Sequence, residues 1–152
     1  MSFEYPRFDD DDLPDDPPQG FKPYEHAGPF SSRNGPFYFK KDADGGHVRA
    51  FRVRTRHCNG AGVIHGGCLM AFADGILGYT AWNAVDGPTL TITMNSDFLS
   101  IARPGDWVEG KGEVIRATKS VVFVKTDLKV GHRTIFHAQA IFKVMRARRP
   151  AR

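Results

Sequence analysis

The sequence predicts an α+β protein in which one long helix is wrapped by an antiparallel β-sheet. Three observations lead to this prediction. Two strand-like runs stand in the first third of the chain, a nearly uncharged apolar run occupies residues 65–83, and four further strand-like runs follow it. The chain of 152 residues shows no internal repeat and no sign of a second domain.

The first two strand-like runs form a predicted hairpin. Residues 36–42 and 47–55 flank a glycine-rich turn at 44–46. The second run alternates Val48 and Ala50 with arginines, although imperfectly. We therefore expect two antiparallel strands joined by a short turn.

The run at 65–83 has the length of a helix of about 28 Å. Its one formal charge is Asp74, so we expect the helix to be buried on most of its sides. A membrane span is the competing interpretation. The carboxylate near the centre, the glycines within the run and the lack of a second such run favour a buried helix instead.

Four strands follow, separated by turns rich in glycine and polar residues. In the first of them Leu90, Ile92 and Met94 alternate with threonines, which predicts one apolar face. A sheet packed on one side only is implied. The four expected strands are residues 89–99, 106–117, 120–130 and 133–145.

Charge divides the chain into three parts. Residues 1–20 carry a net charge of −6 and four prolines, so we expect an extended or disordered acidic arm. It lacks the ligand spacing of a calcium loop. Residues 21–145 form the predicted single domain, and residues 146–152 form a basic tail.

The chain from residue 21 onward has a net charge of +10, which suits nucleic acid, a membrane surface or a small polyanion such as a phosphorylated cofactor. No nucleic-acid recognition motif is present, and we expect neither nucleic acid nor membrane as a partner. The N-terminus lacks the order of a signal peptide, so the expected location is the cytoplasm.

Two cysteines, Cys58 and Cys68, are too few for a disulfide-rich scaffold or an all-cysteine zinc site. Together with His57 and His65 they match no familiar zinc spacing, so we expect no metal. Cys68 as a nucleophile is also disfavoured, because a thiol one turn into an apolar helix is usually a small core residue. We expect free thiols.

Asp74 is the first candidate for chemistry, because an unpaired carboxylate is costly to bury. Nearby hydroxyls could satisfy it in a purely structural role, or it could act on a ligand. Gly66 and Gly67 favour the second reading, since the first N–H groups of a helix are free to bind a developing negative charge. Gly66 and Asp74 are about 12 Å apart along a helix, so both can act on one substrate only in a two-fold dimer.

The spacing of these residues resembles a known family. Asn59 precedes His65 by six positions, His65 begins a His-Gly-Gly motif, and Asp74 follows it by nine. This is similar to the hotdog-fold acyl-CoA thioesterases of the phenylacetic-acid-degradation type, over about residues 45–145. The resemblance implies the hotdog fold, hydrolysis of an acyl-CoA thioester to free acid and coenzyme A, and a homodimer or a homotetramer built as a dimer of dimers.

The resemblance also implies roles for individual residues. Asp74 would be the general base or nucleophile, and the Gly66 N–H would be the oxyanion donor. Asn59 and His65 would orient water and polarise the thioester carbonyl. Whether Asp74 activates water or forms a covalent anhydride stays open, as does the acyl group.

A hydroxyl on the following strand often assists in this family, and Thr91 is the nearest match. Serine is more familiar there, and Thr93 shares the same face. Coenzyme A would bind as part of the substrate, near Gly67 and the basic residues Arg116 and Lys119, with no other cofactor. On chemistry alone, Arg116 and Lys119 are as well explained as solvated turn charges.

Two other functions remain open at this point. A hydratase or dehydratase of acyl thioesters could use the same fold, with an acid and a base acting on neighbouring carbons. A non-enzymatic sensor could bind acyl-CoA without turning it over. The spacing of the Asn, His-Gly-Gly and Asp residues favours the hydrolase.

Overall fold

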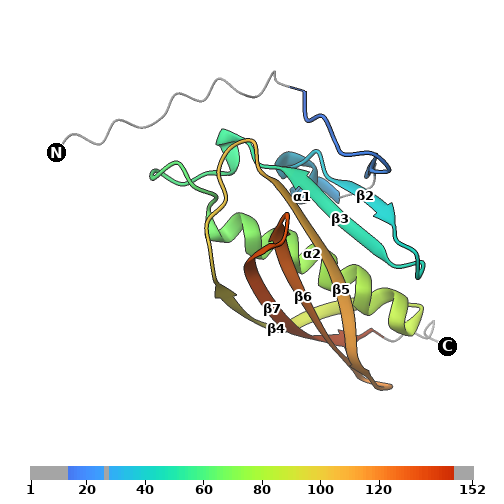
Figure 1. Cartoon of the computed structure of the whole chain (residues 1–152). Helices are drawn as coiled ribbons and strands as arrows, with labels where there is room; N and C mark the ends of the chain where they lie inside the picture. Colours follow the sequence, from blue (N-terminus) through green and yellow to red (C-terminus); the bar gives the residue numbers. More distant parts are fainter. Residues whose placement is uncertain (1–13, 26–27, 146–152) are drawn as a thin grey trace.

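In the computed structural model, the residues described are 14–25 and 28–145. They form an antiparallel sheet around one long helix, with a short second helix at its edge (Figure 1). The helices are α1 (Gly28–Asn34) and α2 (Gly66–Val85), and a 3₁₀ helix, η1, covers Thr55–His57. The strands are β1 (Lys22–Pro23), β2 (Tyr38–Lys41), β3 (His47–Arg52), β4 (Thr89–Phe98), β5 (Trp107–Ala117), β6 (Val121–Val130) and β7 (Arg133–Val144).

The sheet has the order β1-β2-β3-β5-β6-β7-β4 within the described part of the chain, and every neighbouring pair is antiparallel. The strand that follows α2 in sequence, β4, therefore lies at an edge and pairs only with β7. The sheet curves around α2, which crosses it as the central element (Figure 1). This arrangement confirms the predicted α+β fold with a wrapped central helix.

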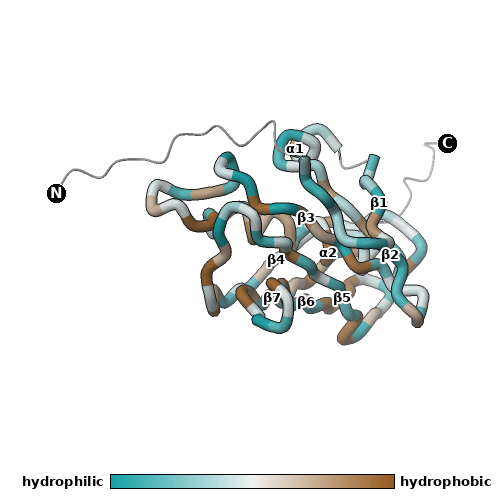
Figure 2. The backbone as a smooth tube through the Cα atoms, turned by 45° about the horizontal axis from the view of Figure 1, so that its top comes forward, coloured by the Kyte–Doolittle hydropathy of each residue, from teal (hydrophilic) through white to brown (hydrophobic). Residues whose placement is uncertain are grey.

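Close packing fixes α2 against the sheet. Its buried side chains, among them Leu69, Phe72 and Leu77, share one apolar core with the inner faces of β5, β6 and β7. A side chain at Gly112 of β5 would overlap the hydroxyl of Thr80 in α2. The glycine therefore allows helix and strand to approach closely, which sets the position of the helix. Figure 2 shows hydrophobic and hydrophilic residues alternating along the strands, as a sheet with one buried face requires.

The predicted elements are found with small shifts at their ends, but one boundary is wrong. The run at 47–55 does not continue as a strand beyond Arg52. The Val53 N–H instead donates to the Asp106 carbonyl at 2.9 Å, and the chain then enters η1. The short elements β1, α1 and η1 were not predicted.

One expectation about burial is corrected. Leu90 and Ile92 do not face the core but are 58% and 57% exposed, since β4 is an edge strand with a bulge between Thr91 and Thr93 that changes its register. Helix α2 is buried or half-buried from Cys68 to Ala81, as expected, and exposed near its ends. Trp82 is 49% exposed, and the face that carries Asp74 borders a cavity.

Residues 14–21 contact the sheet through Asp15 and Phe21, and Lys22–Pro23 join it as edge strand β1. The Asp15 carboxylate pairs with Arg54 at 2.6 Å, and both side chains are less than a tenth exposed. The second carboxylate oxygen of Asp15 accepts the Tyr38 hydroxyl at 2.9 Å. Farther along, Phe21 contacts Tyr38 and Trp107 in a small separate core. The C-terminal end of the acidic arm is thus attached to the sheet.

The rest of the predicted arm, residues 1–13, and the basic tail 146–152 lie outside the described residues. The domain boundaries at 20 and 146 stay predictions. Among the helices that the structure describes, none is long and apolar enough to cross a membrane.

Candidate active site

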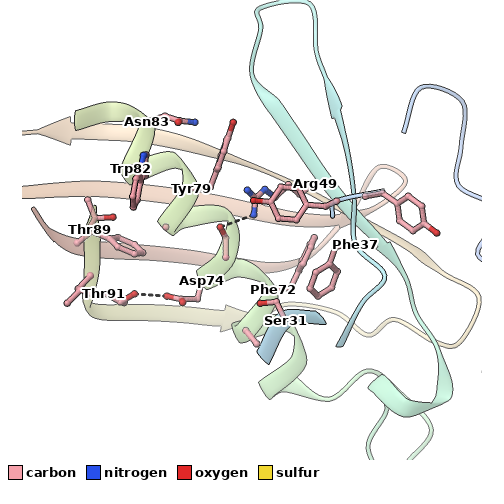
Figure 3. A pocket seen from close by; sticks show the side chains of 17 residues that line it. Ser31, Phe37, Arg49, Phe72, Asp74, Tyr79, Trp82, Asn83, Thr89 and Thr91 are labelled. Atoms are coloured by element: carbon pink, nitrogen blue, oxygen red, sulfur yellow. Dashed lines mark hydrogen bonds between the residues drawn. The ribbon is translucent and has the colours of Figure 1, made fainter. Parts of the chain in front are cut away.

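The main cavity of the described chain has a volume of about 620 Å³ and lies between α2 and the two ends of the sheet (Figure 3). Two walls enclose it. The helix wall comes from α2, β4 and β7 and includes Asp74, Tyr79 and Thr91. The N-terminal wall comes from the segment between Tyr24 and Arg49. Volumes of this size are typical of small-molecule sites.

Asp74 and Thr91 meet in the helix wall. The Thr91 hydroxyl donates a hydrogen bond of 2.8 Å to the Asp74 carboxylate (Figure 3). Asp74 is half-buried in the middle of α2, and Thr91 lies just before the β4 bulge. Thr93, the other hydroxyl considered, does not line the cavity. The helix therefore holds one oriented carboxylate against an aromatic-lined space that a ligand can enter.

His65 is the N-cap residue of α2. Its Nδ1 accepts the Gly67 N–H at 2.8 Å, so in the neutral ring the proton is on Nε2. The Gly67 N–H is consequently occupied. The Gly66 N–H has no hydrogen-bond acceptor within the described ranges, and it lies at the positive end of the helix dipole. The Gly66 N–H is thus available as a hydrogen-bond donor to an anion, and its role as oxyanion donor stays a prediction.

Asn59 acts through the turn that leads to His65. Its side-chain oxygen accepts the Ala61 N–H at 2.9 Å, and its backbone N–H donates to the Val63 carbonyl at 2.8 Å. These bonds close a tight turn before the start of α2. Asn59 does not line the main cavity or the smaller cavity described next. Its contacts within the chain are those of a residue that shapes the turn.

A second, smaller cavity of about 350 Å³ lies at the start of α2. It is bordered by His65, Gly67, Cys58 and Cys68. Burial raises the pKa of the Cys68 thiol to about 11, which agrees with an unreactive, free cysteine. Across residues 14–25 and 28–145, no group of three or more metal-ligating side chains is found.

The predicted site residues thus fall into separate places within one chain. Asp74 and Thr91 line the main cavity, whereas His65 and Gly67 line the smaller one. Arg116, near the end of β5, and Lys119, in the following turn, are both exposed. The chain alone does not bring the Gly66 end of α2 to Asp74.

Sequence reasoning missed the N-terminal wall. Arg49 enters the cavity between the rings of Tyr24 and Tyr79, at 4.5 and 4.3 Å from their centroids. Its Nη1 donates to the Gly75 carbonyl of α2 at 3.2 Å. The one available signal was the imperfect alternation of the 47–55 run, in which arginines take positions on both faces.

Comparison with known proteins identifies the family of the chain. The model of the thioesterase superfamily matches residues 61–136. A Pseudomonas aeruginosa protein that carries the provisional name of an esterase is 34% identical over 127 residues, which is 82% of this chain and 95% of that protein.

Solved structures with similar folds point the same way. A thioesterase-type protein from Streptococcus pneumoniae, solved with coenzyme A, gives a TM-score of 0.67 at 22% identity, over 74% of this chain and 88% of its own. An esterase-type protein from Mycobacterium tuberculosis gives a TM-score of 0.72 at 21% identity, over 80% of this chain and 100% of its own. A phenylacetic-acid-degradation-related thioesterase-type protein from Ralstonia eutropha gives a TM-score of 0.67 at 20% identity, over 77% of this chain and 91% of its own. These neighbours confirm the hotdog fold, and with the family match they show that the chain belongs to the thioesterase superfamily.

Proposed function

We propose that the protein hydrolyses an acyl-CoA thioester to a free acid and coenzyme A. The observation that carries this proposal is the Asp74 carboxylate, held by Thr91 in the wall of a cavity that also carries aromatic side chains. The family supports a thioester as the bond that is cleaved. The coenzyme A bound to the Streptococcus pneumoniae neighbour supports coenzyme A as the thiol.

Asp74 is the general base or nucleophile of the proposed reaction. A thioester carbonyl gains negative charge when it is attacked, and the thiolate leaves readily. One carboxylate and one oxyanion donor therefore suffice, and the reaction requires no cofactor beyond the coenzyme A of the substrate. Thr91 fixes the direction of the carboxylate by its hydrogen bond of 2.8 Å.

The start of α2 supplies the oxyanion donor. The Gly66 N–H is free to bind the carbonyl oxygen, and the helix dipole favours charge there. The Nε2–H of His65 is a second donor that can polarise the carbonyl, because Nδ1 already accepts from Gly67. Asn59 shapes the turn before His65 and so positions both donors.

Two chains are needed to complete the proposed site. Gly66 and Asp74 are eight residues apart in one helix, about 12 Å along its axis, while reacting atoms must approach to about 3 Å. The exposed apolar side chains of β4, Leu90 and Ile92, lie on an edge strand that a second copy can cover. A two-fold homodimer is therefore the proposed catalytic unit.

The phosphates of coenzyme A carry negative charge, and Arg116 and Lys119 are exposed cations at the β5–β6 turn. We assign them to the nucleotide part of coenzyme A, with Gly67 near the path of the thioester. The cytoplasmic location stays a prediction.

The experiment that tests the function measures free coenzyme A with a thiol reagent over a panel of acyl-CoAs. A hydrolase releases thiol continuously in proportion to enzyme. A hydratase consumes an unsaturated acyl-CoA without releasing thiol, and a sensor does neither. Tight acyl-CoA binding with no thiol release from any panel member would contradict the proposal.

Hybrid dimers test the shared site. Asp74→Asn and Gly66→Pro, which removes the donor N–H, are each expected to be inactive alone. A mixed dimer contains one site with an intact Asp74 and an intact Gly66, so mixing should restore up to about half the activity per hybrid dimer. Native mass spectrometry verifies that subunits have exchanged. If subunits exchange and activity is not recovered, Gly66 of one chain and Asp74 of the other do not form one active site.

A further inference from the structure

The N-terminal wall of the cavity places one guanidinium opposite the Asp74 end. Arg49 projects from β3, and its planar group lies between the rings of Tyr24 and Tyr79. Figure 3 shows Arg49 on one side of the cavity, with Asp74 and Thr91 on the other. The cavity therefore carries a carboxylate from one wall and a guanidinium from the other.

The contacts of Arg49 leave donors unused. A guanidinium has five N–H donors. One of them, on Nη1, donates to the Gly75 carbonyl at 3.2 Å, while Nε is buried with no hydrogen-bond partner. Among the described residues, no carboxylate lies within ion-pair distance of Arg49. Burial lowers the pKa of the guanidinium from its usual value, which reflects the cost of this environment.

The aromatic contacts offset only part of that cost. Aromatic faces stabilise a cation, and the Tyr24 side chain adds a hydrogen-bonding contribution, whereas a partner of opposite charge is missing among the described residues. An anion that enters the cavity would supply that partner. Carboxylates fit a guanidinium well, because its parallel N–H groups match the two carboxylate oxygens.

We propose that the cavity selects acyl groups that carry a carboxylate at the end remote from the thioester, with Arg49 as the residue that binds it. This inference rests on the proposed function, because it assigns Asp74 to the thioester end. Like charges repel, so a second carboxylate is disfavoured beside Asp74 and favoured beside Arg49. The opposed charges thus fix the direction in which the substrate enters.

The spacing indicates a short acyl chain. Arg49 binds the carbonyl of Gly75, the residue directly after Asp74 in α2. Asp74 and the Arg49 guanidinium therefore lie beside the same turn of α2, within the reach of a short acyl chain. The cavity that both residues line also carries Phe37, Phe72 and Tyr79, which suits a short apolar spacer between thioester and carboxylate.

The test compares two substrates that differ only in the terminal group, hexanoyl-CoA and adipoyl-CoA. The wild-type protein is expected to hydrolyse adipoyl-CoA with a kcat/KM at least about tenfold higher. Arg49→Met should lower the ratio of the two kcat/KM values about ten- to a hundredfold, and Arg49→Lys should retain part of it. Lys41→Met, an exposed cation of the same hairpin, is the matched control and should leave the ratio unchanged.

Binding separates this inference from the proposed function. S-hexyl-CoA and its terminally carboxylated counterpart cannot be hydrolysed, so calorimetric titration measures recognition alone. Tighter binding of the carboxylated thioether that depends on Arg49, without hydrolysis of either thioester, would support the inference and contradict the function. Two outcomes would overturn the inference and leave the function intact. In the first, the wild-type protein hydrolyses both thioesters but prefers hexanoyl-CoA. In the second, Arg49→Met lowers kcat/KM equally for both substrates.

Discussion

The two walls of the cavity differ in their place in the chain and in what holds them. The helix wall lies mostly within residues 61–136, the part that the thioesterase superfamily shares, and its Asp74 and Thr91 are joined by one hydrogen bond. The N-terminal wall lies wholly before residue 61. Its Arg49 is held by aromatic faces, and the segment that supplies Tyr24 is attached through residues 14–23.

This difference separates the residues proposed for catalysis from those proposed to select the acyl group. The helix wall offers a carboxylate and a nearby hydroxyl, which can act on a thioester of any acyl group. In the proposed reaction, the N-terminal wall contacts the part of the acyl group that lies beyond the thioester. Because the two walls come from separate segments, relatives that keep the helix wall and vary the N-terminal wall can change their acyl-group specificity while they keep the same catalytic residues.

The largest effect is expected at the helix wall. Asp74→Asn keeps the volume of the side chain but removes the base or nucleophile, so turnover should fall by about 10² to 10⁴ with the fold retained. Asp86→Asn is the matched control, since Asp86 is the C-cap residue at the other end of α2. Steady-state release of coenzyme A measures both. Equal activities in the two variants would place the chemistry outside the helix wall.

The attachment of the N-terminal wall should determine stability. Asp15→Asn removes the charge that pairs with the buried Arg54 at 2.6 Å, and the loss of a hydrogen bond between charged groups costs about 1.5–3 kcal/mol. Asp16→Asn makes the same change at the neighbouring residue, whose side chain is exposed, and should cost under about 0.5 kcal/mol. Urea unfolding compares the free energies. Two equally stable variants would show that the ion pair does not hold the segment.

Sequence patterns predicted the helix wall better than the N-terminal wall, for a physical reason. Asp74 is detectable because a single charge in a long apolar run requires a partner. The helix and the long strands are detectable because their side chains repeat with a fixed period. A family resemblance then added Thr91, whose hydrogen bond to Asp74 the structure shows.

The N-terminal wall carries no such periodic signal. Strand β1 and helix α1 are too short to show a period, and an arginine in a strand reads as a solvent-facing charge. The partners of Arg49 are 25 and 30 positions away, at Tyr24 and Tyr79, so their contact is a product of tertiary folding. The exposure of Leu90 and Ile92 was missed because alternation gives a strand two faces without saying whether it lies at an edge.

A smaller effect is expected from pH. Burial, with the hydrogen bond to Asp15, raises the pKa of Tyr38 from 10.0 to about 12. Folding therefore favours the neutral phenol, and this contribution is complete below pH 10 and is lost as pH rises from 10 to about 12. Urea unfolding across that window should show a steeper fall in stability for the wild type than for Tyr38→Phe. Parallel curves would mean that Tyr38 ionises with the same pKa in the folded and unfolded chains.

The smallest effect concerns residues 1–13, which precede the attached segment and carry a net charge of −4. Coenzyme A is an anion, and the rest of the chain is positive, so an acidic stretch near the substrate path would compete for the same cations. Deleting residues 1–13, while keeping Asp15 and its ion pair, should lower the KM for an acyl-CoA about two- to threefold at low salt and leave kcat unchanged.

Salt separates this electrostatic competition from a structural effect of the deletion. The Debye length falls from about 30 Å at 0.01 M salt to about 8 Å at 0.15 M, so the difference in KM should disappear across that range. Replacing the four aspartates 9–12 by asparagine keeps the length of the chain and should reproduce the effect of the deletion. An unchanged or higher KM at low salt in both variants would exclude competition for the cations, and an effect of the deletion alone would assign it to the length of the chain.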